Sequence, residues 1–85
     1  MTEEPIGKIT HYFAHIGVAA ATLTGELAVG DRIRVKGHTT DLTETVESLE
    51  IEHQKVERAA PGADVAFKVS EKVRAGDQVF RVTAG

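Results

Sequence analysis

"LAVGDRIRVKG" at Leu27–Gly37 and "VRAGDQVFRV" at Val73–Val82 are two versions of one sequence pattern. In each, an apolar residue stands three positions before a Gly-Asp pair, and a strand rich in Val or Ile follows. Gly permits a positive φ, and Asp can hydrogen-bond the backbone just after itself, so the pair predicts a sharp turn before a strand. Ligand binding is the alternative, but two Gly-Asp pairs do not form a phosphate cradle. The repeat therefore predicts turns at strand ends, with the apolar residue packed beneath each.

The segments on either side of these turns are predicted to be short strands. Val and Ile outnumber Leu, Thr is frequent, and such β-branched residues suit a pleated, half-buried surface. No segment has a helical period long enough to predict a helix. Strands are expected at residues 6–13, 17–24, 31–37, 43–53, 63–69 and 78–82. Short strands separated by Gly, Pro and Asp turns predict a closed antiparallel barrel of six or seven strands, one domain over residues 1–85.

Alternation along these strands predicts which side chains form the core. The predicted inward residues are Ile33 and Val35, and Leu49 and Ile51, while Val65, Phe67 and Val69 alternate along their strand in the same way. On the first strand, Ile9 and Phe13 are expected to share a face with His11. Val46 lies an odd number of positions from Leu49, so both can face inward only if the strand is irregular between them. We therefore expect a β-bulge near Glu47–Ser48, which would bend the strand around the barrel.

Composition limits the environment and the partners. The formal charge is −3, and phosphate contacts supply most nucleic-acid affinity, so high-affinity nonspecific RNA or DNA binding is not expected. A local, shape-specific RNA contact stays open. The absence of Cys rules out disulfides and fits a reducing compartment. No apolar run approaches the roughly 20 residues that span a bilayer, and "MTEEPIG" is unlike a secretory signal. We expect a cytoplasmic protein without membrane contact.

The residue types of common active sites are missing or badly spaced. Ser48 and Ser70 lie outside any G-x-S-x-G motif, and no GxxxxGK[ST] segment predicts nucleotide binding by this chain alone. His11 and His15 would be about 13 Å apart on one extended strand, too far to share an ion. A turn could bring them closer to each other, and His38 or His53 could contribute. A small metal-dependent enzyme is thus the least favoured alternative, and we expect no enzymatic activity, metal or cofactor.

A basic stripe is the clearest local signal for nucleic acid. Arg32, Arg34 and Lys36 alternate along one strand, so all three point outward. The acidic residues Glu47, Glu50 and Glu52 occupy the next predicted strand, where a hairpin would set them opposite the stripe. Cross-strand ion pairs are common sheet stabilisation, so the stripe has two interpretations, an RNA-binding surface or a set of internal pairs.

Four segments resemble parts of known domains. "VESLEIEHQKVERAAPGADVAFKV" followed by "VRAGDQV" resembles the second domain of the elongation factors that carry aminoacyl-tRNA. "LTGELAVGDRIRVKG" is similar to the second and third strands of that domain. "IGKITHYFAHIGVA" is closer to free-standing translation-factor-like barrels of bacteria and archaea, and to the C-terminal barrel of collagenase-like peptidases. The resemblance covers residues 6–82 and implies the translation-factor domain 2 type of barrel.

The elongation-factor resemblance implies a site for the end of a tRNA. Glu50 matches a glutamate that lines this pocket in the carrier factors, whereas Glu52 replaces an aromatic residue or His, and Asp64 replaces Asn. Ala63 stands where the Gly-Asp turn of the family has Asp, and Lys68 stands where Leu is typical. The candidate binding residues are therefore Arg32, Arg34, Lys36, Glu50, Glu52 and Asp64.

Two functions follow from these observations. The first is a non-enzymatic binding module for RNA, a ribonucleoprotein or a ribosome- or tRNA-related complex, based on the basic stripe, Glu50 and the resemblance. The second is a protein-interaction or accessory barrel that works with a separately encoded peptidase or modification enzyme. The acidic balance, the altered pocket and the likeness to peptidase-linked barrels favour the second.

Overall fold

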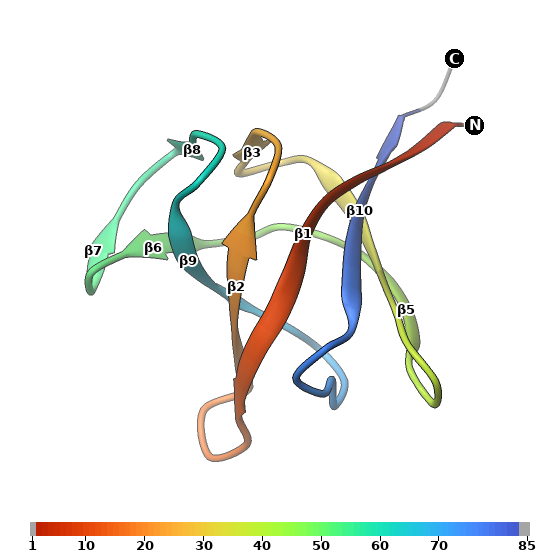
Figure 1. The fold of residues 1–85 in the computed structure, drawn as a ribbon. Coiled ribbons are helices and arrows are strands. Elements are labelled where there is room, and N and C mark those ends of the chain that lie inside the picture. The colour runs from red at the N-terminus through yellow and green to blue at the C-terminus, as the bar shows by residue number, and fades with distance from the viewer. Residues whose placement is uncertain (1, 84–85) are drawn as a thin grey trace.

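Strands and turns make up the whole of residues 2–83, the part of the chain that the computed structural model describes (Figure 1). The strands are β1 (Thr2–Phe13), β2 (Val18–Leu23), β3 (Leu27–Ala28), β4 (Arg32–Lys36), β5 (Asp41–Thr45), β6 (Leu49–Ile51), β7 (Gln54–Lys55), β8 (Arg58–Ala59), β9 (Asp64–Lys68) and β10 (Gln78–Thr83). Over this range there is no helix long and apolar enough to cross a membrane. The predicted all-β class is confirmed. Residues 1, 84 and 85 of the predicted single domain lie outside the described residues.

One antiparallel sheet of eight strands has the order β5-β4-β10-β1-β2-β9-β6-β7, and β3 pairs separately with β8. Strands lie about 4.8 Å apart, so β5 and β6 would be about 29 Å apart in a flat sheet. Only residues 46–48 connect these two strands, and so short a segment reaches about 14 Å at most. The sheet therefore curls until its two ends approach each other, as the green connection that runs behind β1 and β2 shows (Figure 1).

The closed six- or seven-stranded barrel is a wrong prediction, because the described strands number ten and the sheet order has two ends. The backbone at the seam is engaged elsewhere. Val46 donates its N–H to the carbonyl of Asp31 (2.9 Å) and accepts a bond from the N–H of Gly30 (2.9 Å). The segment between β5 and β6 thus bonds to a turn, and not to the strand that would complete the ring.

The strand positions agree closely with the sequence prediction. Each of the six predicted segments overlaps at least one observed strand. The segment at 43–53 overlaps two, because residues 46–48 interrupt it at the place where the irregularity was expected. The additional strands β3, β7 and β8 are only two residues long, and they lie where the sequence predicts turns or the ends of strands. They are too short to produce an alternating pattern.

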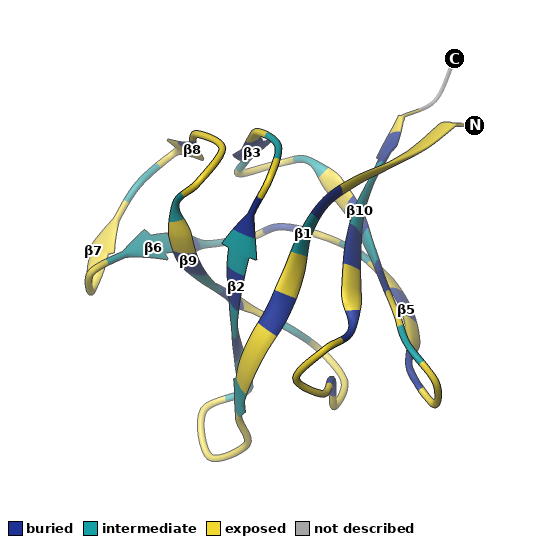
Figure 2. Ribbon diagram, in the orientation of Figure 1, coloured by how far each residue is buried: buried dark blue, intermediate teal, exposed yellow. Residues whose placement is uncertain are grey.

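The core occupies the inside of the curled sheet. On β4, Ile33 and Val35 are fully buried, and on β9, Val65 and Phe67 alternate with half-buried or exposed neighbours, as predicted (Figure 2). Ala19 and Ala21 of β2 are buried, and their small side chains leave room for the larger residues of neighbouring strands. Ile51 and Val69 are half-buried and pack against this cluster.

β1 departs from the predicted alternation. Its register shifts between Pro5 and Gly7 against β10, and again between Ile9 and His11 against β2. Each bulge adds a residue and moves the following side chains to the opposite face. Ile9 is buried, but beyond the second bulge Tyr12 packs against the core while Phe13 is 43% exposed. Phe13 does lie beside His11, but the prediction that Ile9 shares their face is wrong.

The two Gly-Asp pairs form matching turns. Gly30 and Gly76 have φ values of +96° and +97°, a conformation that Gly adopts without steric cost. Asp31 N–H donates to the Ala28 carbonyl and Asp77 N–H to the Arg74 carbonyl, at 3.1 and 3.0 Å. Gly thus occupies the third position of a four-residue turn, where a type II turn requires a positive φ.

The aspartate side chains bond backbone N–H groups that precede them in the chain, whereas the prediction placed these bonds after them. Asp31 Oδ2 accepts from the N–H of Ala28 (3.0 Å), and Asp77 Oδ2 accepts from the N–H of Arg74 (2.9 Å). Each carboxylate bonds the backbone three residues before it, not just after it, because the turn folds the chain back over that N–H. The preceding apolar residues, Leu27 and Val73, are buried as expected.

Candidate functional site

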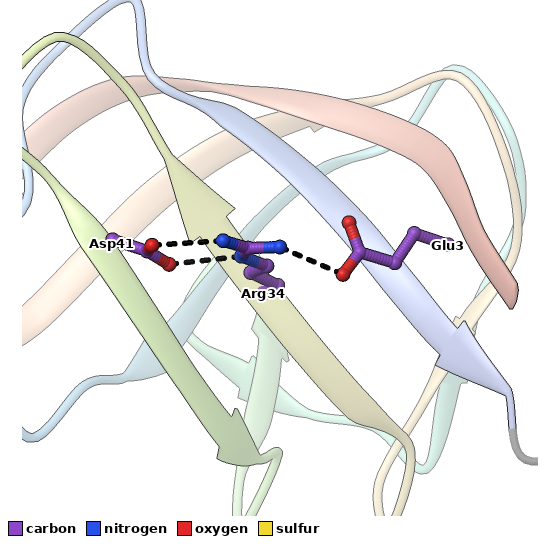
Figure 3. A network of polar contacts seen from close by, with 3 residues as sticks. All are labelled: Glu3, Arg34 and Asp41. Atoms are coloured by element: carbon purple, nitrogen blue, oxygen red, sulfur yellow. Dashed lines mark hydrogen bonds and ion pairs between the residues drawn. The ribbon is translucent and has the colours of Figure 1, made fainter. Parts of the chain in front are cut away.

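The basic stripe lies on the outer face of β4, and its middle residue is occupied. Arg34 donates from Nε and Nη2 to the two carboxylate oxygens of Asp41, both at 2.8 Å, and from Nη1 to Glu3 at 2.9 Å (Figure 3). These bonds raise the pKa of Arg34, and the bond from Arg34 holds the pKa of Asp41 below its usual value. Arg32 and Lys36 are exposed on either side. The stripe points outward as predicted, but its centre is neutralised by two acids.

The partners of the stripe differ from the predicted ones. The strands beside β4 are β5 and β10, and Arg34 is in register with Thr43 and Phe80. Glu50 lies instead on β6, in register with Lys55 on one side and Ala66 on the other. The predicted pairing of the acidic run with Arg32, Arg34 and Lys36 is therefore wrong. Alternation along one strand cannot reveal which strand lies beside it.

The three acidic candidates do gather in one place. Glu50, Glu52 and Asp64 line a shallow depression of about 200 Å³ together with His53. Asp64 accepts a hydrogen bond from the Thr22 hydroxyl at 2.8 Å. Glu52 and His53 form the β6–β7 turn with φ values of +51° and +66°, which non-Gly residues adopt at a steric cost. The charged groups of the depression are all negative, and Ala20, Val65 and Ala66 complete the lining.

The six predicted residues therefore form two surfaces, not one site. In the sheet order, three strands (β10, β1 and β2) separate β4 from β9. The basic residues lie on β4, whereas the acidic ones lie on β6, the β6–β7 turn and β9. The tRNA-end role that the resemblance implies for Glu50, Glu52 and Asp64 stays a prediction.

A groove follows the seam where the strand order is interrupted. It consists of two adjoining hollows of about 320 and 400 Å³ that share Glu47 and Lys68. Glu44, at one end, accepts hydrogen bonds from the backbone N–H and the hydroxyl of Ser70. Sequence reasoning missed Glu44 and Ser70 as neighbours. The expected bulge at 47–48 was the available signal, because a bulged strand leaves its neighbour partly uncovered.

The turn between β1 and β2 carries the second feature that sequence reasoning missed. Phe13 is 43% exposed and Ile16 is 63% exposed. The ring of His11 lies edge-on to Phe13, with centroids 4.4 Å apart. We call residues 11–18 the β1–β2 tip. The signal was present in the sequence, because no Asp, Glu, Lys or Arg lies between Lys8 and Glu26.

The histidines are dispersed over the molecule. His11 and His15 lie at the β1–β2 tip, His38 in the β4–β5 turn, and His53 in the β6–β7 turn. Among residues 2–83, no three His, Cys, Asp or Glu side chains are grouped so that they could hold a metal ion.

Known proteins of similar sequence are proteases. The chain is 40% identical over 78 residues to a collagenase of Porphyromonas gingivalis, a match that covers 89% of this chain and 22% of the collagenase. It is 37% identical over 76 residues to an uncharacterized protease of Methanocaldococcus jannaschii, covering 88% of this chain and 19% of that protein. The chain thus spans about a fifth of the length of the curated relatives it matches. No protein-family model matches it.

Two solved structures have a similar fold. The C-terminal domain of a provisionally assigned U32 peptidase from Geobacillus thermoleovorans superposes with a TM-score of 0.88 at 20% identity, covering 94% of this chain and 93% of that one. The selenomethionine form of that domain gives a TM-score of 0.85 at 22% identity, covering 89% and 96%. The two chains share a fold. The predicted likeness to collagenase-like peptidases is supported, and the likeness to the elongation factors stays a prediction.

Proposed function

We propose that this chain is a non-catalytic accessory domain that works with a peptidase domain through protein–protein contacts. The observation that carries the proposal is the 40% identity to a collagenase of which the chain covers only 22%. A segment of this size is a small part of such a protein, and the fold is that of a C-terminal domain in a protein assigned to the peptidases. The expected partner of this domain is then a peptidase domain like the one that would make up the remainder of the longer relatives.

The charges of the two candidate surfaces support a protein partner over RNA. Nucleic-acid affinity depends on free Lys and Arg side chains that contact phosphates. The central cation of the basic stripe already carries two carboxylates, from Glu3 and Asp41. The other candidate surface presents Glu50, Glu52 and Asp64, which repel a phosphate backbone. Neither surface offers an uninterrupted positive track.

A replacement experiment tests the proposal. The segment of the P. gingivalis collagenase that matches this chain is deleted in one variant and replaced by residues 1–85 of this chain in another, here called the chimera. Hydrolysis of denatured collagen is measured for the intact enzyme, the deletion, the chimera and the isolated chain. We expect the deletion to retain less than about a tenth of the activity, the chimera to recover more than about half, and the isolated chain to have none.

Circular dichroism and gel filtration of each variant separate loss of function from loss of folding. A folded, monodisperse chimera that is no more active than the deletion contradicts the proposal, as does hydrolysis by the isolated chain. Fluorescence anisotropy with a short RNA hairpin ending in CCA, at two salt concentrations, tests the RNA alternative. Binding that weakens as salt rises, and that is lost in R32E/K36E, would support RNA instead.

A further inference from the structure

Apolar side chains are exposed at one end of the molecule. Ile16 and Phe13 are two of the three large hydrophobic residues that are exposed in the described part of the chain, and both belong to the β1–β2 tip. The tip projects beyond the end of the sheet, away from both chain ends, and nearly all of its loop is exposed (Figures 1 and 2). The first and last described residues, Thr2 and Thr83, lie at the opposite end and so do not cover the tip.

The tip is also the part of the chain without formal charge. Charged residues make up 27% of the sequence, yet Lys8 and Glu26 enclose a stretch that has none. The cores of protein–protein interfaces are depleted of charge and enriched in aromatic residues. Tyr12 and Phe13 supply the aromatic groups here. A phosphate-bearing partner has no Lys or Arg to contact on this stretch.

The backbone holds the tip in a defined shape. The β1–β2 register continues to the pair Phe13–Val18, so only residues 14–17 form the loop. Ile16 donates its N–H to the Phe13 carbonyl at 3.3 Å, and the Gly17 carbonyl accepts from Val69 N–H at 2.9 Å. A loop that is ordered before binding loses little conformational entropy in a complex.

The tip is continuous with the groove along the seam. Val18 lines one hollow of the groove, and Val69, bonded to Gly17, lines the other. The groove contributes Glu47 and Lys68 beside the uncharged tip. An apolar centre next to a rim of mixed charge is the usual composition of a protein-binding face.

We propose that the β1–β2 tip is the docking element of this chain, and that it inserts Phe13 and Ile16 into an apolar socket on a peptidase domain. This inference rests on the function proposed above. A peptidase domain is the expected partner because the matched segment is only about a fifth of each relative, so the rest of each relative is about four times as long as this segment. Because this protein is only 33 Å in its longest dimension, a domain of that size reaches the tip from a connection at either terminus.

Hydrogen–deuterium exchange of the chimera tests the docking directly. Exchange of a peptide covering residues 13–18 is compared between the isolated chain and the chimera, with residues 37–41 of the β4–β5 turn as an internal control. We expect exchange at the tip to slow by about tenfold or more in the chimera, while the control peptide is unchanged. Equal exchange at the tip in an active chimera overturns the docking inference and leaves the proposed function standing. An inactive, folded chimera with an unprotected tip overturns both.

A matched pair of variants assigns the effect to the tip. Ile16→Asp places a charge at the tip, and Val29→Asp places one at the third exposed apolar residue, in the turn between β3 and β4. Both sites are exposed, so both isolated chains should melt within a few degrees of the parent. In the chimera, I16D should remove the protection and lower the hydrolysis at least tenfold, whereas V29D should change neither. Equal effects of the two variants contradict the inference.

Two further measurements assess other occupants. Sedimentation of the isolated chain should give a monomer, and a dimer that I16D abolishes would assign the tip to a second copy instead. Amide shifts at residues 13–18 on addition of the CCA-ending RNA hairpin would assign it to RNA. Either result overturns docking on a peptidase.

Discussion

The turns at Gly30-Asp31 and Gly76-Asp77 share a backbone conformation and differ in their surroundings. Asp77 is 6% exposed and lies against Gly37, where a Cβ would overlap its carboxylate. Asp31 is half-buried and lines a hollow of about 370 Å³ together with Arg58 and Arg81. The aspartate of the same four-residue turn is thus buried in one case and half-buried in the other.

A third turn separates the contributions of Gly and Asp. Gly62 has a φ of +91°, and Ala63 N–H donates to the Ala60 carbonyl at 3.2 Å, although no Asp follows the Gly. The turn therefore requires the Gly, while the aspartate adds a hydrogen bond whose contribution to the free energy of unfolding depends on how far it is buried. Substitutions in the two turns can measure this difference.

Removing the enclosed aspartate should have the largest effect. We expect Asp77→Ala to lower the free energy of unfolding by about 1.5–3 kcal/mol, because a buried, charged acceptor of the Arg74 N–H is lost. Urea unfolding followed by circular dichroism measures this, with Asp77→Asn as the control that keeps an acceptor oxygen. A loss below 0.5 kcal/mol, on the order of the experimental resolution, contradicts the idea that burial decides the value of the bond.

The neighbour of Asp77 gives the next effect. Gly37→Ala should cost about 2 kcal/mol, because the new methyl group displaces the Asp77 carboxylate from its bond to Arg74. The same change made in D77A should cost little, since the carboxylate is absent. Additive losses in the double variant would show that the two residues do not act through this contact.

The two turn glycines should respond equally. Neither Gly30 nor Gly76 has an atom within 4 Å of an added Cβ, so only the positive φ opposes a side chain. We expect Gly30→Ala and Gly76→Ala to cost about 1 kcal/mol each. Denaturant midpoints measured in parallel compare them, and a difference above about 1 kcal/mol would mean that the turns are not equivalent in backbone energy.

Loss of the half-buried aspartate, Asp31, should cost less than loss of Asp77. Asp31→Ala is expected to cost about 0.5–1 kcal/mol, because water can replace the carboxylate at the Ala28 N–H. The comparison with D77A under the same conditions is the decisive measurement. If D31A costs as much as D77A, the aspartates contribute equally and burial is not the cause of the difference.

The smallest effect on stability is expected for Asp41, whose carboxylate bonds the Arg34 side chain and not a backbone N–H. The pKa of Asp41 is below its ordinary value of 3.8, mainly through its hydrogen bonds from Arg34. Its contribution to stability is complete above the unfolded pKa and is lost as the pH falls through the lower folded pKa. Asp41→Asn should therefore flatten the loss of stability below about pH 4, as thermal melts from pH 6 to pH 2 would show. An unchanged acid profile would contradict a role for this pair.

Sequence reasoning succeeded where the structure depends on alternation within one strand. Ile33 and Val35, or Val65 and Phe67, are assigned to the core from the period of two alone. The phase of β1 could not be obtained in this way, because its two bulges depend on the strands on either side. The open ends of the sheet could not be predicted for the same reason, because Val46 bonds Gly30 and Asp31, which are distant in sequence.

In the candidate site too, the sequence predicts the face on which a residue lies but not its partners on other strands. Glu50 and Asp64 meet because β6 and β9 are paired, with Glu50 opposite Ala66. The basic stripe was correctly placed on an outer face, but its acidic partner comes from β5 and β1, which no local pattern indicates. The exposed tip was detectable as an uncharged stretch, yet only the shifted phase of β1 turns Phe13 outward.

The pairing of the first strand with the last has a topological consequence. Thr2 and Thr83 are register partners on β1 and β10, so the two ends of the chain leave the sheet side by side (Figure 1). Such a domain can be inserted into a single surface loop of another protein without separating the ends of that loop. It can also be circularly permuted, with a short linker joining the present ends and new ends cut in the β4–β5 turn. The fold thus sets few requirements on where in a longer chain its sequence begins.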